Sequence, residues 1–211
     1  MTKQLIRKDL GVCDYLPTYL RMQQFSAQRP PDQIDELWLL QHPPVFTLGR
    51  NSKPEHLLAP GDIPVVPIDR GGQVTYHGPG QLVGYILLDV KRNGFGVRQL
   101  VTALEQSIVA LLADYQIDSH AKPDAPGVYV GERKIAALGL RIKGGKSYHG
   151  LSLNLDMDTE PFSRINPCGY AGLQIAQMRE FLDPIDEQQI KSRLTAHLAR
   201  ILGYDEVIDG H

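Results

Sequence analysis

RGGQVTYHGPGQL, residues 70–82, is the most informative stretch of this 211-residue chain. Four glycines fall within its first twelve residues, and the apolar run LVGYILL at 82–88 begins at its last residue. A glycine has no Cβ, so its backbone can pass close to a ligand and can adopt positive φ angles. A loop so rich in glycine adds little to the stability of a fold. We therefore interpret residues 70–81 as one wall of a binding site.

The hydrophobic pattern on either side of this loop predicts a mixed fold. Apolar residues at helical spacing predict helices at 14–28, 97–116 and from Asp186 to about 201. Short apolar or alternating runs predict strands at 36–41, 45–48, 82–89, 128–130, 134–142 and 151–155. Strands outnumber helices and several follow one another as hairpins. We expect a single α/β domain of the α+β type over 1–211, with a mixed, largely antiparallel sheet packed by helices on one face.

Composition argues against several classes of protein. The net charge is −2 and 22% of residues are charged, which does not suit a nucleic-acid-binding polycation. Two cysteines are too few for a disulfide framework and fit a reducing compartment. Residues 1–10 contain no apolar segment of signal-peptide length, and no stretch reaches the roughly 20 apolar residues of a membrane span. We expect a cytoplasmic protein without nucleic-acid or membrane partners.

Cys168 is the candidate nucleophile. A free cysteine is most often a small buried hydrophobic residue, and we interpret Cys13, at the start of the first helix, in that way. Cys168 instead lies in INPCG, residues 165–169, between a proline and a glycine and without apolar neighbours. Such a turn presents a thiol in a loop, where reactive cysteines are commonly found.

A catalytic thiol needs a partner that takes its proton. His77 and His149 are formal candidates, and Lys134 is a less obvious one. In the expected strand 134–142, Lys134 shares a face with Ala136, Leu138 and Leu140, so its amine should be partly buried. A buried lysine and a neighbouring thiol would share one proton as a coupled pair. Without such a partner, Lys134 is an exposed lysine of a hairpin.

Other cofactor chemistry finds little support in the sequence. No CxxC or HxxxH pattern predicts a metal site. The glycine-rich loop lacks the Gly-Lys-Ser/Thr end of a phosphate loop, and Gly78-Pro79-Gly80 is not a dinucleotide motif. We expect no metal and no cofactor. The basic residues Arg141, Lys143 and Lys146 form either a solvated hairpin end or a docking patch for an acidic partner.

Taken together, these segments resemble the octanoyltransferases of lipoate biosynthesis, also called lipoyl(octanoyl) transferases. The matching motifs are HPPVFTLGR at 42–50, RGGQVTYHGPGQL at 70–82, KIAALGLRI at 134–142, HGLSLNLD at 149–156 and INPCG at 165–169. They occur in the family's order and span most of the chain. One departure is Tyr148, which stands where many relatives place a further histidine.

The resemblance implies the catalytic fold that biotin and lipoate ligases share. It implies Cys168 as nucleophile and Lys134 as the residue that activates it. It also implies that the acyl chain and its thioester lie against Arg70, Gly71, Gly72, Gln73, Val74, Thr75, Tyr76, His77, Ala137, Leu138, Gly139, Gly150, Leu151 and Ser152.

The implied reaction moves an octanoyl group from octanoyl-acyl carrier protein to a lysine of a lipoyl domain through an acyl-cysteine thioester. The implied acceptors are the lipoyl domains of 2-oxoacid dehydrogenase E2 subunits and the glycine cleavage H protein. Two alternatives stay open. One is an ATP-dependent lipoate-protein ligase, which would share the fold without needing Cys168. The other is a module that binds acylated carrier protein without turnover.

Overall fold

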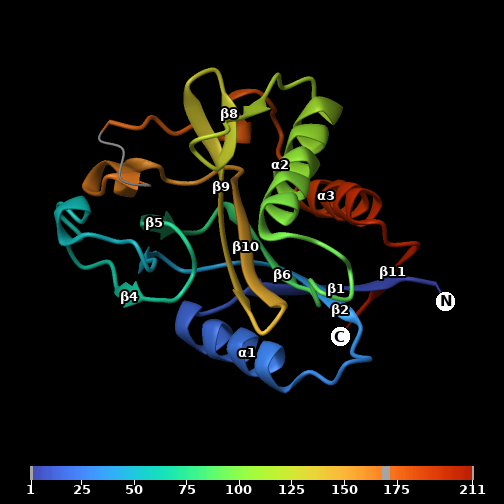
Figure 1. Ribbon diagram of the computed structural model, residues 1–211. Coiled ribbons are helices and arrows are strands. Elements are labelled where there is room, and N and C mark those ends of the chain that lie inside the picture. The colour runs from blue at the N-terminus through green and yellow to red at the C-terminus, as the bar shows by residue number, and fades with distance from the viewer. Residues whose placement is uncertain (1, 168–171, 211) are drawn as a thin grey trace.

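The computed structural model of the chain describes residues 2–167 and 172–210. Its centre is an eight-stranded sheet in the order β11-β1-β2-β6-β10-β9-β8-β7 (Figure 1). These strands are β1 (Gln4–Val12), β2 (Asp35–Gln41), β6 (Gln81–Leu87), β7 (His120–Ala121), β8 (Gly127–Val130), β9 (Arg133–Lys143), β10 (Lys146–Asn154) and β11 (Glu206–Asp209). Strand β1 pairs in parallel with β2 and β11, and every other pairing in this sheet is antiparallel. The predicted mixed, largely antiparallel sheet is confirmed.

A second, smaller sheet includes residues 74–77, so the stretch 70–81 that was expected to be a loop contains a strand. Its order is β4-β3-β5, with β3 (Val45–Leu48) between β4 (Val65–Pro67) and β5 (Val74–His77). Its side chains form a small apolar cluster that includes Phe46, Tyr76 and Phe162. Short 3₁₀ turns lie at η1 (Pro54–His56), η2 (Glu160–Arg164) and η4 (Met178–Glu180).

The three helices lie on both faces of the large sheet, which corrects the expectation of helices on one face only. Helices α2 (Val97–Asp114) and α3 (Glu187–Leu202) cover one face, and α1 (Tyr15–Gln28) covers the other (Figure 1). Successive side chains of a strand point to opposite faces. In β2, accordingly, Leu37 and Leu39 join the α2/α3 core, while Trp38 and Leu40 join the core beneath α1.

The predicted helix positions agree with the structure to within about two residues at their ends. Helix α3 begins after Asp186, whose carboxylate accepts a hydrogen bond from the Gln189 backbone N–H at 3.0 Å. It ends at Gly203, which has φ of +71° and satisfies the left-handed termination that favours glycine. Strands β1, β4, β5, β7 and β11 were not predicted from the sequence.

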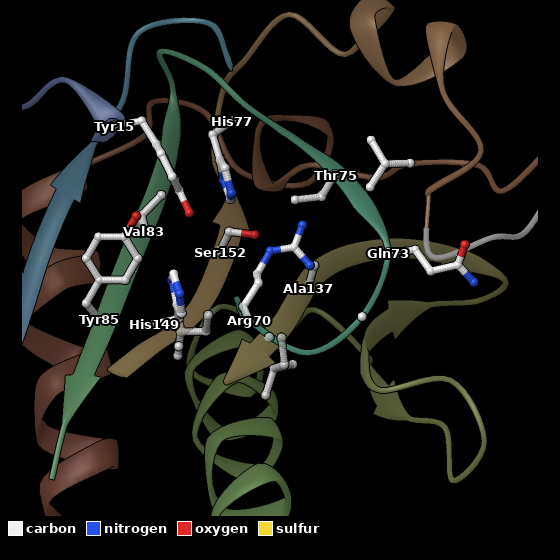
Figure 2. A pocket seen from close by; sticks show the side chains of 16 residues that line it. Tyr15, Arg70, Gln73, Thr75, His77, Val83, Tyr85, Ala137, His149 and Ser152 are labelled. Carbon is white, nitrogen blue, oxygen red and sulfur yellow. The ribbon is translucent and has the colours of Figure 1, made fainter. Parts of the chain in front are cut away.

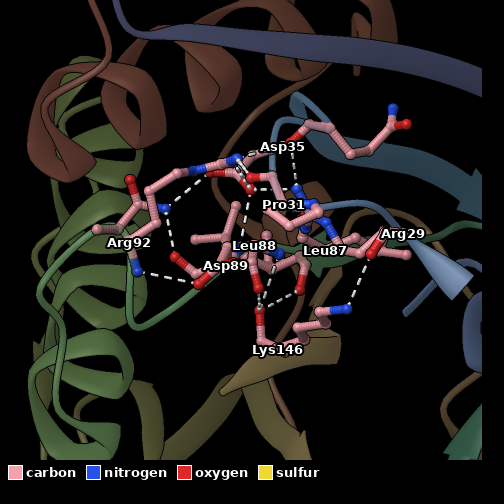
Figure 3. Close-up of polar contacts among 12 residues, drawn as sticks. Arg29, Pro31, Asp35, Leu87, Leu88, Asp89, Arg92 and Lys146 are labelled. Atoms are coloured by element: carbon pink, nitrogen blue, oxygen red, sulfur yellow. Dashed lines mark hydrogen bonds and ion pairs between the residues drawn. The ribbon is translucent and has the colours of Figure 1, made fainter. Parts of the chain in front are cut away.

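A buried carboxylate joins four segments at the end of the molecule away from the glycine-rich loop. Asp35 at the start of β2 is 1% exposed (Figure 3). It accepts hydrogen bonds from Arg29 at 2.7 Å, Arg92 at 2.8 Å, Asn93 at 2.7 Å, Tyr204 at 2.7 Å and the Asp89 backbone N–H at 2.8 Å. Desolvation opposes the charge of Asp35, but these donors together hold the pKa of its carboxyl below the usual value.

Candidate functional site

A cavity that is partly open to solvent lies where the glycine-rich loop meets β6, β9, β10 and the start of α1 (Figure 2). It is lined by Tyr15, Arg70, Gly72, Gln73, Val74, Thr75, His77, Val83, Tyr85, Ala137, Leu138, Gly139, His149, Gly150, Leu151 and Ser152. Twelve of the fourteen predicted substrate-contacting residues are therefore brought together around one space, although they come from three distant parts of the sequence.

Small residues on the paired strands β9 and β10 make room for this cavity. Gly139 lies opposite Gly150 in the ladder, and Ala137 lies opposite Ser152. A Cβ at Gly139 would come within 3.0 Å of the Arg70 side chain, and one at Gly150 would overlap the carbonyl oxygen of Gly84. Glycine at these two positions therefore lets the loop and the neighbouring strand approach closely.

Arg70 fixes the glycine-rich loop against the small sheet. Its guanidinium donates to the carbonyl and the hydroxyl oxygen of Thr47, each at 2.9 Å, and to the carbonyl of Gly71, also at 2.9 Å. The residue is 8% exposed, so the guanidinium lies inside the protein among these carbonyl and hydroxyl acceptors. This arrangement assigns Arg70 a role in holding the cavity wall.

Two residues of the predicted wall do not line the cavity. Gly71 lies just behind it, with its backbone N–H donating to the Leu140 carbonyl at 2.9 Å. Tyr76 is 3% exposed and packs with Phe46 and Phe162 in the cluster beneath the small sheet.

Four residues that sequence analysis did not assign to the wall line it as well: Tyr15, Val83, Tyr85 and His149. Tyr15 stacks on His77 with ring centroids 5.8 Å apart. Tyr15, Val83 and Tyr85 follow the same apolar spacing along their helix and strand as any core residue. The sequence therefore contains no signal that distinguishes them as cavity residues. His149 was considered only as a general partner for the thiol.

Two hydrogen bonds join Tyr85 through His42 to the backbone. The Nδ1 atom of His42 lies 2.6 Å from the Cys13 carbonyl, and its Nε2 atom lies 2.6 Å from the Tyr85 hydroxyl. Burial lowers the pKa of His42 to about 4, so the ring is neutral at pH 7. A carbonyl can only accept, so Nδ1 carries the proton and Tyr85 donates to Nε2.

The other two histidines of the cavity are also held by buried partners. His77 Nδ1 lies 2.6 Å from Gln81 Oε1, and burial lowers the pKa of His77 to about 3. His149 Nε2 lies 3.3 Å from Asp69, and burial lowers its pKa too, against the opposing effect of that carboxylate. Its φ of +60° is uncommon for a residue other than glycine. The cavity thus presents neutral rings rather than charged ones.

Tyr148, the departure from the family pattern, points away from the cavity toward the same carboxylate. Its hydroxyl donates to Asp69, which also accepts from Tyr19 at 2.9 Å. These bonds and the contact with His149 hold the pKa of Asp69 below its usual value, although burial alone would raise it.

Lys134 lies at the start of β9, and its predicted burial is confirmed at 3% exposure. Its Nζ atom donates to the Pro126 carbonyl at 3.1 Å and lies 5.2 Å from the centre of the Tyr129 ring. The register between β8 and β9 shifts between Val128 and Tyr129, which adds one residue to β9. Strict alternation is broken there, so the expectation that Lys134 continues the face of Ala136, Leu138 and Leu140 is corrected.

A smaller cavity, lined in part by Lys134, adjoins the large one. It shares the residues Thr75, Ala137 and Ser152 with the large cavity, and its lining also includes Lys134 and Pro167. Pro167 is the residue before Cys168 in the sequence. Cys168 itself lies outside the described residues.

The remaining predicted side chains occupy ordinary positions. Cys13 is half-buried and its thiol donates to the Leu10 carbonyl at 3.1 Å, in agreement with a packing role. In the basic group, Arg141 lies 3.6 Å from Asp69 and Lys146 donates to the Arg29 carbonyl at 2.9 Å. Only Lys143 of the three is exposed.

Searches of the described part of the chain give two further findings. Residues 2–167 and 172–210 contain no group of three or more histidine, cysteine, aspartate or glutamate side chains placed to hold a metal ion. None of the helices described has the length and hydropathy needed to cross a bilayer.

Comparison with known proteins gives a consistent result. Residues 16–199 match the family model for the lipoyl protein ligase A/B catalytic domain. An octanoyltransferase of Azotobacter vinelandii is 60% identical over 98% of this chain and 95% of its own length. A bipartite lipoate protein ligase of Thermoplasma acidophilum superposes with a TM-score of 0.75 at 14% identity, over 100% of this chain and 87% of that one. For a biotin protein ligase of Aquifex aeolicus the TM-score is 0.56 at 14% identity, over 96% and 70%. The last two likenesses confirm the predicted fold.

Proposed function

The chain belongs to the lipoyl protein ligase A/B catalytic-domain family, and on that premise we propose that it is an octanoyltransferase that acts through Cys168 and Lys134. The observation that carries the proposal is the buried Lys134 amine, which lines the continuation of an apolar cavity together with Pro167. The high identity with an octanoyltransferase supports the choice of acyl group.

The cavity suits a medium-length acyl chain. Its walls combine aliphatic side chains, ring faces and glycine backbone with the polar side chains of Arg70, Gln73, Thr75 and Ser152, and burial lowers the pKa values of its two histidines, so that their rings are neutral. Burying a methylene group contributes about 0.8 kcal/mol, so seven carbons beyond the carbonyl would supply roughly 5 kcal/mol of binding free energy before entropic costs. The carbonyl end of the chain would lie near Thr75, Ala137 and Ser152, where the two cavities meet.

The first half of the reaction would form an acyl-cysteine. Lys134 accepts the proton of the Cys168 thiol, and the thiolate attacks the thioester carbonyl of the acylated carrier. The bond between carbon and the carrier sulfur breaks, and the carrier thiolate takes the proton back from Lys134. A buried amine is costly to charge, so transferring this proton to the leaving thiolate is favourable.

The second half would move the acyl group to an acceptor lysine. That lysine is a poor nucleophile at pH 7 because the ordinary pKa of its amine is about 10.4. The acceptor ammonium first loses one proton to solvent. Lys134 then takes a second proton as the amide bond forms and returns it to the Cys168 sulfur as the carbon–sulfur bond breaks. Exchange between thioesters is nearly balanced and amide formation is downhill, so this course needs no ATP.

We propose octanoyl-acyl carrier protein as the donor, and lipoyl domains of 2-oxoacid dehydrogenase E2 subunits and the glycine cleavage H protein as acceptors. Acyl carrier proteins are acidic, and exposed Lys143 at the end of β9 is the member of the basic group most accessible to them. A chain with two cysteines fits a reducing compartment, and we place the reaction in the cytoplasm.

Incubation with octanoyl-carrier alone, followed by intact mass and peptide mapping, tests the nucleophile directly. The wild-type protein should gain one octanoyl group on Cys168, and Cys168→Ser should gain none. Cys13→Ser is the matched control, because it leaves Cys168 as the sole thiol and should acquire the adduct normally. An adduct that persists in Cys168→Ser would refute the assignment.

Lys134→Arg tests the proton transfer. The substitution keeps a positive charge but removes the base, since a guanidinium is always protonated near neutral pH. Acylation of Cys168 and octanoylation of an apo lipoyl domain should both fall steeply. Full activity in Lys134→Arg would refute the role of Lys134 as a base and would leave it a purely electrostatic role. Transfer that requires ATP and survives loss of Cys168 would favour a ligase, and tight carrier binding without any acylated product would favour a binding module.

A further inference from the structure

The large cavity has two unlike ends. Toward the glycine-rich loop, Gly72 is exposed, and Gln73 and Gly139 are half-exposed. At the other end, Tyr15 is 5%, Tyr85 4%, His149 2% and Val83 1% exposed. Figure 2 shows the latter four gathered on one side of the cavity and Gln73 on the opposite side. The cavity is therefore a slot with a mouth and a closed end.

Hydrogen bonding makes the closed end apolar toward the cavity. Tyr85 donates to His42, which is 0% exposed. The Tyr85 proton thus has an acceptor within the wall, so its hydroxyl imposes no need for a polar ligand. The ring of Tyr15 is held by its stacking on His77 and its contact with His42, with ring centroids 5.8 Å and 4.9 Å apart.

The dimensions of the slot match a chain of about eight carbons. Ala137 pairs with Ser152 on β10, which pairs with Val83 on β6, and Tyr85 follows two residues beyond Val83. Two inter-strand steps of about 4.8 Å and two residues of about 3.4 Å place Tyr85 roughly 12 Å from Ala137. Seven carbon–carbon bonds of about 1.5 Å in a zigzag reach about 9 Å. The terminal methyl of such a chain would meet the rings of Tyr15 and Tyr85.

We infer that Tyr15, supported by Tyr85 and Val83, forms the end wall that sets the maximum acyl length. The inference rests on the proposed acyl transfer and adds the residues that limit its substrate. Longer chains are excluded because the Tyr15 ring is held by its stacking on His77 and by its contact with the His42 ring. Shorter chains fit but leave part of the apolar surface uncovered, at a loss of about four-fold in affinity per methylene.

A competition experiment tests the wall. The protein is mixed with equal concentrations of hexanoyl-, octanoyl-, decanoyl- and dodecanoyl-carrier and an apo lipoyl domain, and intact mass gives the product ratios, hence the ratios of kcat/KM. Tyr15→Ala should raise the decanoyl-to-octanoyl ratio by about 15-fold, the value for two further buried methylenes. Val83→Leu should shift the preference the other way, toward hexanoyl, so the test does not depend on one variant folding.

Two controls separate the wall from other effects. Tyr15→Phe keeps the ring and should keep the decanoyl-to-octanoyl ratio whatever its effect on rate. Leu16→Ala lies on the same turn of α1 but is 50% exposed, so it should match the wild type. A wild type that transfers octanoyl, with ratios unchanged in both Tyr15→Ala and Val83→Leu, would overturn the end wall alone. A wild type that transfers no octanoyl from the carrier would overturn the proposed function itself.

Discussion

Replacing Asp35 by asparagine should cost the protein a large part of its stability while leaving the cavity intact. The amide has nearly the shape of the carboxylate, but it carries no charge and presents N–H donors in place of one oxygen. All five partners of Asp35 are donors. The side chains of Asp35 and Arg29 are 2% and 1% exposed, so the guanidinium would remain buried without its carboxylate.

The magnitude follows from this burial. Removing one partner of a buried ion pair typically costs 3–5 kcal/mol, because the remaining charge stays desolvated. Domains of this kind are stable by about 5–15 kcal/mol in total. At roughly 2–4 °C per kcal/mol for a chain of this size, the midpoint of thermal unfolding should fall by about 10 °C.

Urea unfolding of the wild type and three variants would measure the effect. Tyr204→Phe removes a single donor to the same carboxylate and should cost about 1.5–3 kcal/mol. Asp209→Asn is the matched control, because the Arg7–Asp209 ion pair is solvent-exposed and should contribute less than about 1 kcal/mol. Octanoyl transfer at 20 °C should be unchanged in all three. A loss below about 1 kcal/mol for Asp35→Asn, similar to that of Asp209→Asn, would refute the reasoning.

Three further outcomes are expected. Gly150→Ala should abolish transfer and lower the unfolding free energy by about 1–3 kcal/mol or more, because the Cβ of the new alanine would overlap the Gly84 carbonyl. Normal activity and stability in this variant would contradict the close approach of β6 and β10. The unfolding free energy should be largest above about pH 6.5 and should fall as the pH drops toward 4. The reason is that His42 and His77 have lowered pKa values in the folded protein, so in this range they bind protons only in the unfolded chain. Urea titrations that give equal stability at pH 7 and pH 5 would contradict this. Lys143→Glu should raise the KM for octanoyl-carrier and weaken the dependence of KM on salt, without changing kcat. Steady-state kinetics at two ionic strengths would measure this. Unchanged kinetics would refute the docking patch.

The elements that sequence patterns predicted well are those whose apolar periodicity is strong. Helix α2 carries a continuous stripe, including Leu100, Leu104 and Ile108, and all three are fully buried. Strand β1 was missed because QLIRKDLGV mixes charged and apolar residues and most of it is only half-buried. Its position follows from pairing with β2 and β11, which depends on contacts between segments far apart in the chain.

Within the site, the sequence could predict the backbone better than the side-chain partners. The glycine positions at 139 and 150 mark a close approach that a glycine pattern can reveal. The bond from Arg70 to Thr47 and the stacking of Tyr15 on His77 join segments 23 and 62 residues apart, and no local pattern encodes them. The face of Lys134 was predicted from strict alternation, which one extra residue in β9 is enough to reverse.

The two outermost strands of the large sheet are short, with two residues in β7 and four in β11. A long unpaired strand offers a row of free backbone donors and acceptors on which another polypeptide can add itself. Strand β11 covers part of the nine-residue β1, and three of its residues are exposed, including the acidic Glu206 and Asp209, which would repel a similar edge. Loss of residues 206–209 would expose the edge of β1 and favour strand pairing between copies of the chain. Such a deletion would therefore cause self-association, even though it lies far from the acyl cavity.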